Sequence, residues 1–318
     1  MCGIADIFLR NGATVGEQPL AAMTTCLAHR GPDGDGFFRR GPVGLGHRRL
    51  AIIDLVTGDQ PMSNEEAGVT VVFNGEIYNF RGLRRELEAR GSRFRTASDT
   101  EVILRAYEEY GLDCLRHLRG MFAFAIWDHR RQRLFLARDR VGIKPLVYAW
   151  DGRRLLFASE PKAILEDPSV PRRIDWEALR DYLTLHYIPS PRTIFADIRK
   201  LPPGCFLTVD LNGGAPRVQR YWDLRFEPDV RRSEGEWLEG LQAHLQDAVS
   251  SHLVSDVPIG AFLSGGMDSS TVVALMARAT RGDVRTFAIG FDEASHDELA
   301  HARRVAQHHG TQHFEFVV

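Results

Sequence analysis

Short apolar runs separated by glycine-rich turns fill the chain from its start to about residue 210. The runs have period-two character, with apolar side chains at alternate positions, which is typical of strands. Because the connections between them are short, we expect mostly antiparallel pairing. The predicted strands cover residues 69–73, 121–127, 134–137, 155–158 and 206–209.

Helical patterns interrupt these strands. Leu83 and Leu87 lie one turn apart and predict a first helix. Ser98 and Glu101 have the spacing of a capping box, which predicts the start of a second helix. A third helix is expected to start at Asp175. Strands combined with amphipathic helices predict a layered α+β structure.

The pattern changes after residues 211–233, a polar stretch with glycine and proline that lacks sustained periodicity and predicts a linker. Ser233 and Glu236 form a second capping-box pair. A stripe of apolar residues follows at helical spacing: Trp237, Leu238, Leu241, Leu245, Val249 and Leu253. Beyond this helix the pattern predicts a buried strand at 259–263, strands at 286–291 and 313–318, and helices at 269–279 and 297–309. This order implies a parallel, doubly wound sheet.

Length and composition are consistent with two soluble domains. The chain has 318 residues, of which 44% are hydrophobic and 26% charged, and this is too long for one average core. We expect a first domain at residues 2–210, the linker at 211–233 and a second domain at 234–318.

Charge and segment patterns argue against several classes of protein. A net charge of −2 provides no basic field for nucleic acid. No apolar stretch approaches the ~20 residues that span a bilayer, and the N-terminus lacks signal-peptide features, so we expect a cytoplasmic protein without membrane contact. Cys26, Cys114 and Cys205 lack metal-ligand spacing, and we expect them to be reduced core residues.

Cys2 is the first candidate for catalysis. Removal of Met1 would leave a thiol and a free α-amine on one residue, which places a nucleophile beside a base. The ordinary pKa is about 7.7–8.0 for such an amine and about 8.5 for the thiol, so a modest shift lets the amine accept the thiol proton near neutral pH. This pair suits acyl transfer through a thioester. A cysteine at position 2 can also arise by chance.

A second candidate lies between the strand and the helix predicted around residues 264–270, where the sequence is S-G-G-M-D-S-S. The glycines allow backbone to approach a pyrophosphate, and the helix N-terminus offers unpaired N–H groups. No Gly-Lys-Ser/Thr follows, so this is not a Walker loop. Asp268 and the two serines suit a pyrophosphate leaving group and its Mg²⁺ instead. A plain glycine-rich turn is the alternative.

Together these two features resemble glutamine-hydrolysing asparagine synthetases, and further motifs of that family follow in order. They are H-R-G-P-D at 29–33, H-R-R-L at 47–50, N-G-E-I-Y-N at 74–79, S-D at 98–99, G-M-F-A-F at 120–124, R-D-R at 138–140, G-I-K-P-L at 142–146 and S-E at 159–160. The resemblance implies an N-terminal-nucleophile hydrolase sandwich, with stacked antiparallel sheets between helices. It also implies that the start of an α/β ATP-pyrophosphatase domain follows.

For the first domain the resemblance implies a glutamine site around Cys2. Arg49 would bind the α-carboxylate through two hydrogen bonds, and Asp99 would receive the α-ammonium. The side-chain amide of Asn74 and the backbone N–H of Gly75 would form the oxyanion hole. Backbone groups of Ile52, Ile53 and Glu76 would complete the pocket.

Other interpretations of these residues remain open at this point. Asn74-Gly75 is also a favoured dipeptide for a type I′ hairpin turn. Arg49 and Asp99 are also consistent with an ordinary surface ion pair. His29 and His47 are interpreted as structural, because the terminal amine already supplies the base.

For the second domain the resemblance implies ATP across the strand ends, with Mg²⁺ at Asp268. The implied ATP contacts are Leu263, Ser264, Gly265, Gly266, Asp268, Ser269 and Ile289. Core packing is the alternative for Leu263 and Ile289. An acidic cluster follows, which we expect to cap a helix and which has a metal or substrate role as its alternative: Asp292, Glu293, His296, Asp297 and Glu298.

The family continues past Val318, so we expect this chain to be an N-terminal fragment or a truncated product of a full-length amidotransferase. In the leading hypothesis Cys2 hydrolyses glutamine, and the ammonia aminates an aspartyl-AMP made with ATP. The alternatives are a related enzyme for another carboxylate, such as a polysaccharide or peptide precursor, a glutaminase-only fragment, and a degenerate binding module. The 264–270 loop argues against a purine-pathway phosphoribosyl amidotransferase. Expected small-molecule partners are glutamine, ATP and aspartate, and a homodimer stays open.

Overall fold

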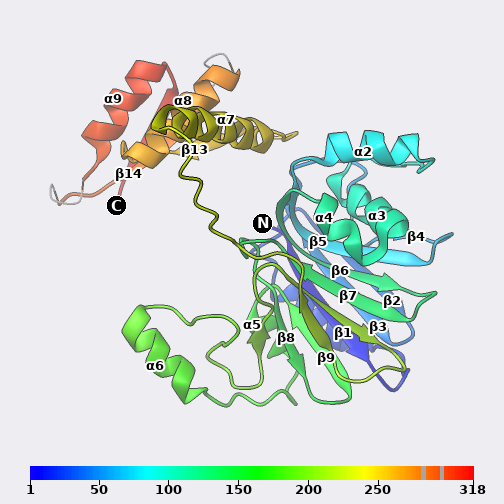
Figure 1. Cartoon of the computed structure of the whole chain (residues 1–318). Helices are drawn as coiled ribbons and strands as arrows, with labels where there is room; N and C mark the ends of the chain where they lie inside the picture. The colour runs from blue at the N-terminus through cyan, green and yellow to red at the C-terminus, as the bar shows by residue number, and fades with distance from the viewer. Residues whose placement is uncertain (281–283, 294–296) are drawn as a thin grey trace. The chain divides into compact units, whose positions relative to one another are not determined.

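The computed structural model describes residues 1–280, 284–293 and 297–318 of the chain (Figure 1). It separates into two compact units, Met1–Arg225 and Phe226–Val318. None of the helices in these described ranges is long and apolar enough to cross a bilayer.

Two antiparallel six-stranded sheets form the centre of the first unit, with strand orders β10-β8-β9-β1-β3-β2 and β12-β11-β7-β6-β5-β4. The first sheet consists of β1 (Gly3–Leu9), β2 (Gly34–Arg40), β3 (Val43–Arg49), β8 (Val147–Trp150), β9 (Arg154–Ala158) and β10 (Arg199–Lys200). The second consists of β4 (Met62–Asn64), β5 (Val69–Ile77), β6 (Gly120–Asp128), β7 (Arg133–Arg138), β11 (Cys205–Asp210) and β12 (Arg217–Arg220).

Helices pack on the outer faces of both sheets (Figure 1). The first sheet is covered by α1 (Glu17–Thr25) and α5 (Pro161–Ile164). Beside the second sheet lie α2 (Phe80–Ala89), α3 (Asp99–Tyr110), a short 3₁₀ turn (Gly111–Asp113) and α4 (Cys114–His117). The last helix of this unit is α6 (Trp176–Leu185), for which Asp175 is the N-cap, as the sequence predicted.

Strand β6 shows how the layers pack. Trp127 points to the space between the sheets and contacts Phe8 of β1, with ring centroids 6.1 Å apart. Phe124 packs edge-on against Phe135, which stacks on Tyr107 of α3. Apolar side chains on both faces therefore join sheet to sheet and sheet to helix. This architecture confirms the predicted sandwich of stacked antiparallel sheets between helices.

The structure rules out one alternative interpretation in this unit and corrects one predicted boundary. Asn74 and Gly75 do not form a hairpin turn, because both lie inside β5, where Gly75 pairs with Phe122 of β6. The expected linker contains β12, whose Cys205↔Arg220 pairing attaches it to β11, and the compact unit extends to Arg225. β12 lies at the edge of its sheet and pairs with one strand only. Its sequence therefore lacks the clear period-two pattern from which a strand is predicted.

The four cysteines are free thiols. Cys114 and Cys205 are buried, as expected for reduced core residues, whereas Cys26 is only half-buried because it caps the end of α1.

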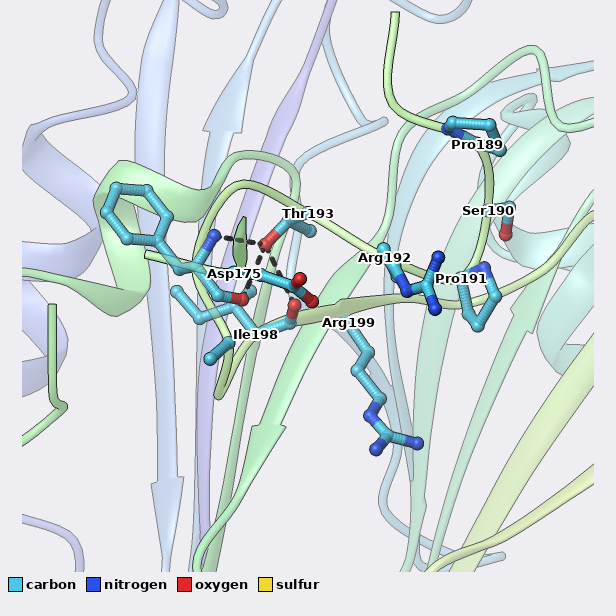
Figure 2. Close-up of a pocket in the computed structure, with 10 residues that line it drawn as sticks. Asp175, Pro189, Ser190, Pro191, Arg192, Thr193, Ile198 and Arg199 are labelled. Carbon is cyan, nitrogen blue, oxygen red and sulfur yellow. Dashed lines mark hydrogen bonds between the residues drawn. The ribbon is translucent and has the colours of Figure 1, made fainter. Parts of the chain in front are cut away.

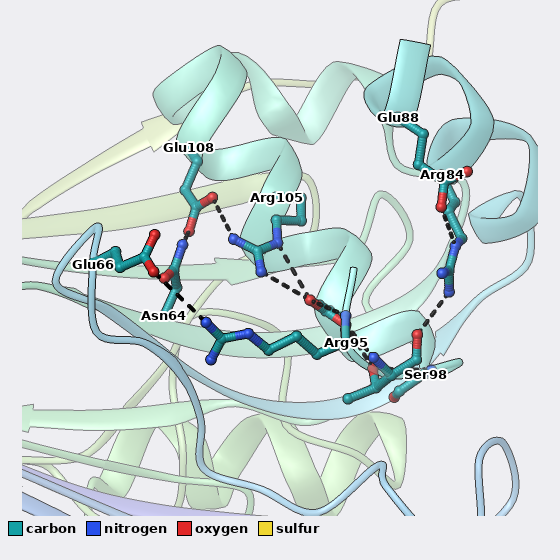
Figure 3. Close-up of polar contacts among 10 residues, drawn as sticks. Asn64, Glu66, Arg84, Glu88, Arg95, Ser98, Arg105 and Glu108 are labelled. Atoms are coloured by element: carbon teal, nitrogen blue, oxygen red, sulfur yellow. Dashed lines mark hydrogen bonds and ion pairs between the residues drawn. The ribbon is translucent and has the colours of Figure 1, made fainter. Parts of the chain in front are cut away.

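The capping box predicted at Ser98 and Glu101 forms only in part. The Ser98 hydroxyl accepts a hydrogen bond from the N–H of Thr100. The Glu101 carboxylate does not return to Ser98. It is buried, accepts from the N–H of Thr96 at 2.7 Å, and pairs with Arg105 at 3.0 Å (Figure 3). Glu101 binds the guanidinium of Arg105, one turn further along the helix, because a hydrogen bond to a charged group is stronger than one to the neutral backbone N–H of Ser98.

In its described residues the second unit has a parallel sheet of order β13-β14-β15, as predicted: β13 (Gly260–Phe262), β14 (Arg285–Gly290) and β15 (Gln312–Val317). The helices are α7 (Glu234–His252), α8 (Met267–Thr280) and α9 (Leu299–His309). The predicted capping box of Ser233 and Glu236 is present at the start of α7. The apolar stripe of α7 lies largely exposed within this unit, for example at Trp237 and Leu241.

The first strand of this sheet is not buried, contrary to the prediction. Residues of α8 and α9 such as Val273 and Ala302 pack on Ala288 and cover one face of the sheet. Phe262 points to the other face and is 79% exposed. The apolar run at 259–263 does contain a strand, β13. A run of apolar residues does not show, however, whether one or both faces of the sheet are covered by other elements.

Candidate functional site

Cys2 stands directly before β1, with a half-buried side chain. Its thiol faces the backbone of Leu50, 3.6 Å from the carbonyl oxygen and 3.4 Å from the nitrogen. Nε of Arg30 donates to the carbonyl oxygen of Cys2 at 2.9 Å, and Nη1 of Arg30 pairs with Glu160 at 2.8 Å. Two motifs far apart in the sequence therefore hold the N-terminus in place.

The segment after β3 is fixed by the H-R-G-P-D motif. A Cβ atom at Gly31 would lie 2.3 Å from the carbonyl carbon of Arg48, so only glycine allows these two backbones to approach. The Asp33 carboxylate accepts from the N–H of Ala51 at 2.9 Å. Ile52 and Ile53, predicted to offer backbone groups to glutamine, follow in an irregular, half-buried segment.

The thiol lies in a field of several charges. Burial raises the pKa of Cys2, and the charges of Glu76 and Asp99 raise it further, whereas the charge of the Met1 amine lowers it. Burial lowers the pKa of the Met1 amine, and the charges of Lys144 and Arg30 lower it further. Charged groups from several segments of the chain therefore act on the start of the chain.

Glu76 and Asp99 are two acids that approach one another here. Burial, reinforced by mutual repulsion, raises the pKa of Glu76, and burial also raises that of Asp99. Asp99 is 4% exposed and accepts a hydrogen bond from the N–H of Ile77 at 2.9 Å. It is therefore not a member of a surface ion pair. A buried acid and a half-buried acid with raised pKa values favour an arriving cation.

The start of α3, where Asp99 lies, is braced by polar contacts (Figure 3). Glu101 binds the backbone of Arg95 and Thr96, and Arg84 donates to the carbonyl oxygen of Thr96 at 2.7 Å. Arg105 joins Glu101 to Glu108. These contacts fix the loop that delivers Asp99 to the site.

Asn74 is fully buried in β5. Within the described part of the chain, neither its Oδ1 nor its Nδ2 has a hydrogen-bond partner. The next residue, Gly75, allows β6 to approach, because a Cβ atom there would lie 2.0 Å from the carbonyl oxygen of Met121. Leaving a buried amide unbonded costs stability, so Asn74 is poised for an acceptor that arrives from outside.

Arg49 ends β3 and is 9% exposed. Its guanidinium donates to the carbonyl oxygens of Asp54 and Leu55 and to the Asp59 carboxylate, the last at 2.7 Å. The ion-pair interpretation is therefore correct for Arg49 with Asp59, whose side chain is 82% exposed, and wrong for Arg49 with Asp99. An exposed carboxylate on a buried guanidinium can be exchanged for a substrate carboxylate.

Both histidines have structural surroundings. His47 is fully buried between the sheets, where Nε2 lies 3.1 Å from the carbonyl oxygen of Phe73, and burial lowers its pKa to about 4. Nε2 of His29 lies 3.0 Å from the carboxylate of Glu160. The sequence predicts no role for Lys144, Arg30 or Glu160. These residues lie within the family motifs given above, but nothing in the sequence near them indicates that they lie close to Cys2.

A separate pocket of about 460 Å³ opens beside the segment between α6 and β10 (Figure 2). None of the predicted site residues lines it. The Thr193 hydroxyl in its wall donates to Ile198 at 2.8 Å and accepts from the N–H of Phe195. Arg192 in the same wall pairs with Glu177. These polar groups serve the local fold.

In the second unit, a pocket of about 250 Å³ lies at the carboxyl ends of β13 and β14. Its lining includes four of the predicted ATP contacts, Leu263, Ser264, Ser269 and Ile289, together with Phe262, Phe287, Ala288 and Glu298. Gly265, Gly266 and Asp268 do not line it. Leu263 packs in the core, as the alternative interpretation had it, whereas Ile289 is half-exposed.

The loop itself is closely packed. A Cβ atom at Gly265 would lie 2.5 Å from the backbone of His301 in α9. The buried hydroxyl of Ser270 has no hydrogen-bond partner among the described residues. Of the acidic cluster, Asp297 accepts from the N–H of Leu299 at 3.2 Å, Glu298 lines the pocket, and His296 lies outside the described residues. No group of three metal-ligating side chains occurs in the described ranges.

Comparisons with known proteins match both units. Residues 1–222 match the family model of the glutamine amidotransferase domain, and residues 240–318 match that of asparagine synthase. Asparagine synthetase (glutamine-hydrolyzing) 1 of Bacillus subtilis is 39% identical over 100% of this chain and 50% of its own length. Putative asparagine synthetase (glutamine-hydrolyzing) 2 of Methanocaldococcus jannaschii is 38% identical over 99% of this chain and 64% of its own length. The chain thus spans about half the length of the first of these relatives.

Solved structures agree on the fold. Glutamine phosphoribosylpyrophosphate amidotransferase from Bacillus subtilis has a TM-score of 0.51 at 20% identity, over 90% of this chain and 65% of its own. An allosteric regulatory enzyme of purine biosynthesis has a TM-score of 0.52 at 16% identity, over 99% of this chain and 80% of its own. The chain therefore belongs to the glutamine amidotransferase family, with a class II glutamine amidotransferase domain that is followed by sequence matching part of the asparagine synthase domain.

Proposed function

We propose that the first unit hydrolyses glutamine to glutamate and ammonia, with Cys2 as the nucleophile and with Asn74 and Gly75 as the oxyanion hole. The observation that carries this proposal is the Asn74 amide, which is fully buried yet unbonded among the described residues. Such a group weakens the fold and is useful only when an acceptor reaches it. A tetrahedral oxyanion formed beside the thiol is an acceptor of this kind.

The chemistry follows from the groups around Cys2. Once Met1 is removed, the neutral α-amine takes the thiol proton, and the thiolate attacks the carboxamide carbon of glutamine. The C–N bond breaks, and ammonia leaves with the proton held by the amine. Water then attacks the thioester, and its oxygen becomes part of the new carboxylate of glutamate, while the thiol regains a proton. Asn74 stabilises the oxyanion in both steps.

Recognition of free glutamine uses the two charged groups on its α-carbon. Its α-carboxylate replaces Asp59 on the guanidinium of Arg49, which keeps its hydrogen bonds to the loop backbone. Its α-ammonium binds at Asp99 and Glu76, the acids whose pKa values burial raises. We assign backbone contacts to Ile52, Ile53 and Glu76.

For the second unit we propose ATP binding and amination of an acyl-AMP, with aspartate as the acceptor. The supporting observations are the pocket at the strand ends, the Gly265 contact that leaves no room for a side chain, and the unbonded Ser270 hydroxyl. ATP supplies the adenylate that activates the carboxylate. Asp268 offers a single carboxylate for Mg²⁺, which phosphates and water would otherwise surround. Related amidotransferases for other carboxylates are the alternative.

Glutamate release in the absence of ATP tests the glutaminase. Cys2→Ala should abolish it, whereas substitution of the matched, half-buried cysteine that follows α1, Cys26→Ala, should leave it intact. Extra residues ahead of Cys2 should also abolish it, because the amine becomes an amide and no longer accepts a proton. Turnover by Cys2→Ala at the rate of the unmodified protein would refute the assignment.

Product analysis with labelled glutamine, ATP and Mg²⁺ identifies the acceptor. Label in asparagine when aspartate is supplied would support the proposed acceptor. Label only with another carboxylate would replace aspartate and leave the glutaminase proposal standing.

A further inference from the structure

Gln60 lies two residues before β4 and is half-buried. Its backbone runs close to β2, because a Cβ atom at Gly36 would lie 2.0 Å from the carbonyl oxygen of Gln60. Continuing the Met62↔Val71 register of β4 and β5 by two residues places Gln60 opposite Phe73. The Gln60 side chain therefore starts beside β5, next to the segment of the proposed oxyanion hole.

The side-chain amide of Gln60 joins two elements of the proposed glutamine site. Its Oε1 accepts from the N–H of Phe73 in β5 at 2.6 Å, and its Nε2 donates to the hydroxyl of Thr100 in α3 at 3.2 Å. A backbone N–H can only donate, so it fixes which end of the amide faces β5. Phe73 precedes Asn74, and Thr100 follows Asp99. One amide therefore links the strand of the proposed oxyanion hole to the helix that carries the proposed ammonium site.

A second link between β5 and α3 lies at the other end of this segment. The Asp99 carboxylate accepts from the N–H of Ile77, the last residue of β5, at 2.9 Å. Residues 74–76 thus lie between two links, with Gln60 at the Phe73 end and Asp99 at the Ile77 end. Asp99 also serves the substrate ammonium in the proposed function, whereas the Gln60 link is made by protein groups alone.

The backbone that enters Asn74 is held on both sides of Phe73. Gln60 binds the N–H of Phe73, and Nε2 of His47 lies 3.1 Å from its carbonyl oxygen. Side chains take the place of a strand partner here, because β4 begins only at Met62. The position of the Asn74 backbone therefore depends on these side chains as well as on the strand ladder.

We propose that Gln60 is a positioning residue for glutamine hydrolysis, whose two hydrogen bonds set the place of the Asn74 amide relative to Asp99. A glutamine bound through its ammonium then presents its carboxamide to the oxyanion hole. This inference rests on the proposed glutaminase function. A misplaced oxyanion donor stabilises the transition state less, so Gln60 affects kcat more than it affects substrate binding.

Gln60→Met tests this role, because it keeps a long unbranched side chain and removes both hydrogen bonds. We expect kcat for glutamate release to fall by about 10- to 100-fold, with KM close to its original value. Inhibition by added glutamate, which carries the same charged groups on its α-carbon, should stay unchanged. A general disturbance of the loop would instead raise KM, because this loop holds Arg49 through Asp54 and Leu55.

Thr100 variants test the link separately and decide the matter if Gln60→Met does not fold. Thr100→Val removes the hydroxyl and keeps the shape, so Gln60 keeps Phe73 and loses α3. We expect it to lower kcat by about 10-fold, whereas Thr100→Ser, which keeps the hydroxyl, should stay close to the original rate. The double variant of Gln60→Met and Thr100→Val should be no slower than Gln60→Met, because both changes remove one shared contact.

Thr193→Val is the matched control for the loss of a threonine hydroxyl. That hydroxyl accepts from the N–H of Phe195 at 3.1 Å and donates to the carbonyl oxygen of Ile198 at 2.8 Å. It lies in the wall of the 460 Å³ pocket, which none of the predicted site residues lines. We expect this control to lower the urea midpoint and to leave kcat unchanged.

Unchanged kcat in folded Gln60→Met or in folded Thr100→Val would overturn the proposal, and so would a rise in KM without a fall in kcat. An equal fall of kcat in Thr100→Ser or in Thr193→Val would also overturn it, because reduced stability would then account for the lower rate. Absence of glutamate release by the unsubstituted protein would refute the proposed function, and this inference with it.

Discussion

Asn74 should weaken the fold while it enables catalysis, and Asn74→Leu separates these two effects. Leucine has the same branching and the same number of side-chain heavy atoms as asparagine, and it removes both unbonded polar atoms. Each unsatisfied buried group costs about 1–3 kcal/mol, and an imperfect fit of the new side chain costs up to ~1.5 kcal/mol. The free energy of unfolding should therefore stay the same or rise by about 1 kcal/mol. Loss of one oxyanion donor should lower kcat by about 10²–10³-fold.

The assays are urea unfolding and glutamate release, measured on the same preparation. Asn79→Leu is the matched control, because it substitutes an asparagine of the same segment whose amide is bonded at both ends. Nδ2 of Asn79 donates to His117 at 2.8 Å, and its Oδ1 accepts from the N–H of Arg119 at 2.9 Å. We expect this control to lose about 1–3 kcal/mol of stability and to retain kcat.

The opposite pattern would refute the reasoning. If Asn74→Leu loses more than about 2 kcal/mol of stability and folded protein still turns over glutamine, the Asn74 amide has a structural partner and no part in the oxyanion hole. Equal stability losses in the two variants would also show that the buried amide of Asn74 is satisfied in solution.

Three further predictions concern recognition, nucleotide chemistry and acid stability. Arg49→Lys should raise KM for glutamine by about 10- to 100-fold, because a point charge cannot make the two-pronged contact; a fall in thermal stability with unchanged KM would contradict this. In a full-length protein that carries this sequence, Asp268→Ala should abolish ATP-dependent pyrophosphate release and spare glutamate release; loss of both would contradict the assignment to separate units. Burial lowers the pKa of His47 to about 4, below its unfolded value near 6.5, so the unfolded chain binds more protons and stability falls as pH drops through this window. His47→Gln should flatten that part of the urea-midpoint profile, and an identical slope would count against it.

Local sequence signals predicted much of the fold, because they report contacts between near neighbours. The period-two run at 121–127 became β6, and the Ser233–Glu236 spacing became a complete capping box. Both depend on residues within one element. The same logic failed at Glu101, where a buried arginine one turn later competes for the carboxylate. It also failed at Phe262, since an apolar residue does not reveal whether a second layer covers it.

The sequence by itself determined which residues could do chemistry: a thiol at position 2, an arginine, an asparagine-glycine pair and an acid in ordered motifs. Only the tertiary structure decided how they are used. The Leu50 contact joins Cys2 to a residue 48 positions away, and Asp139 joins Lys144 to Phe122 of β6, which pairs with Gly75. Burial, and with it the raised or lowered pKa of each acid and base, arises only when distant strands enclose a side chain. No local pattern carries that information, because desolvation is a property of the packed layers.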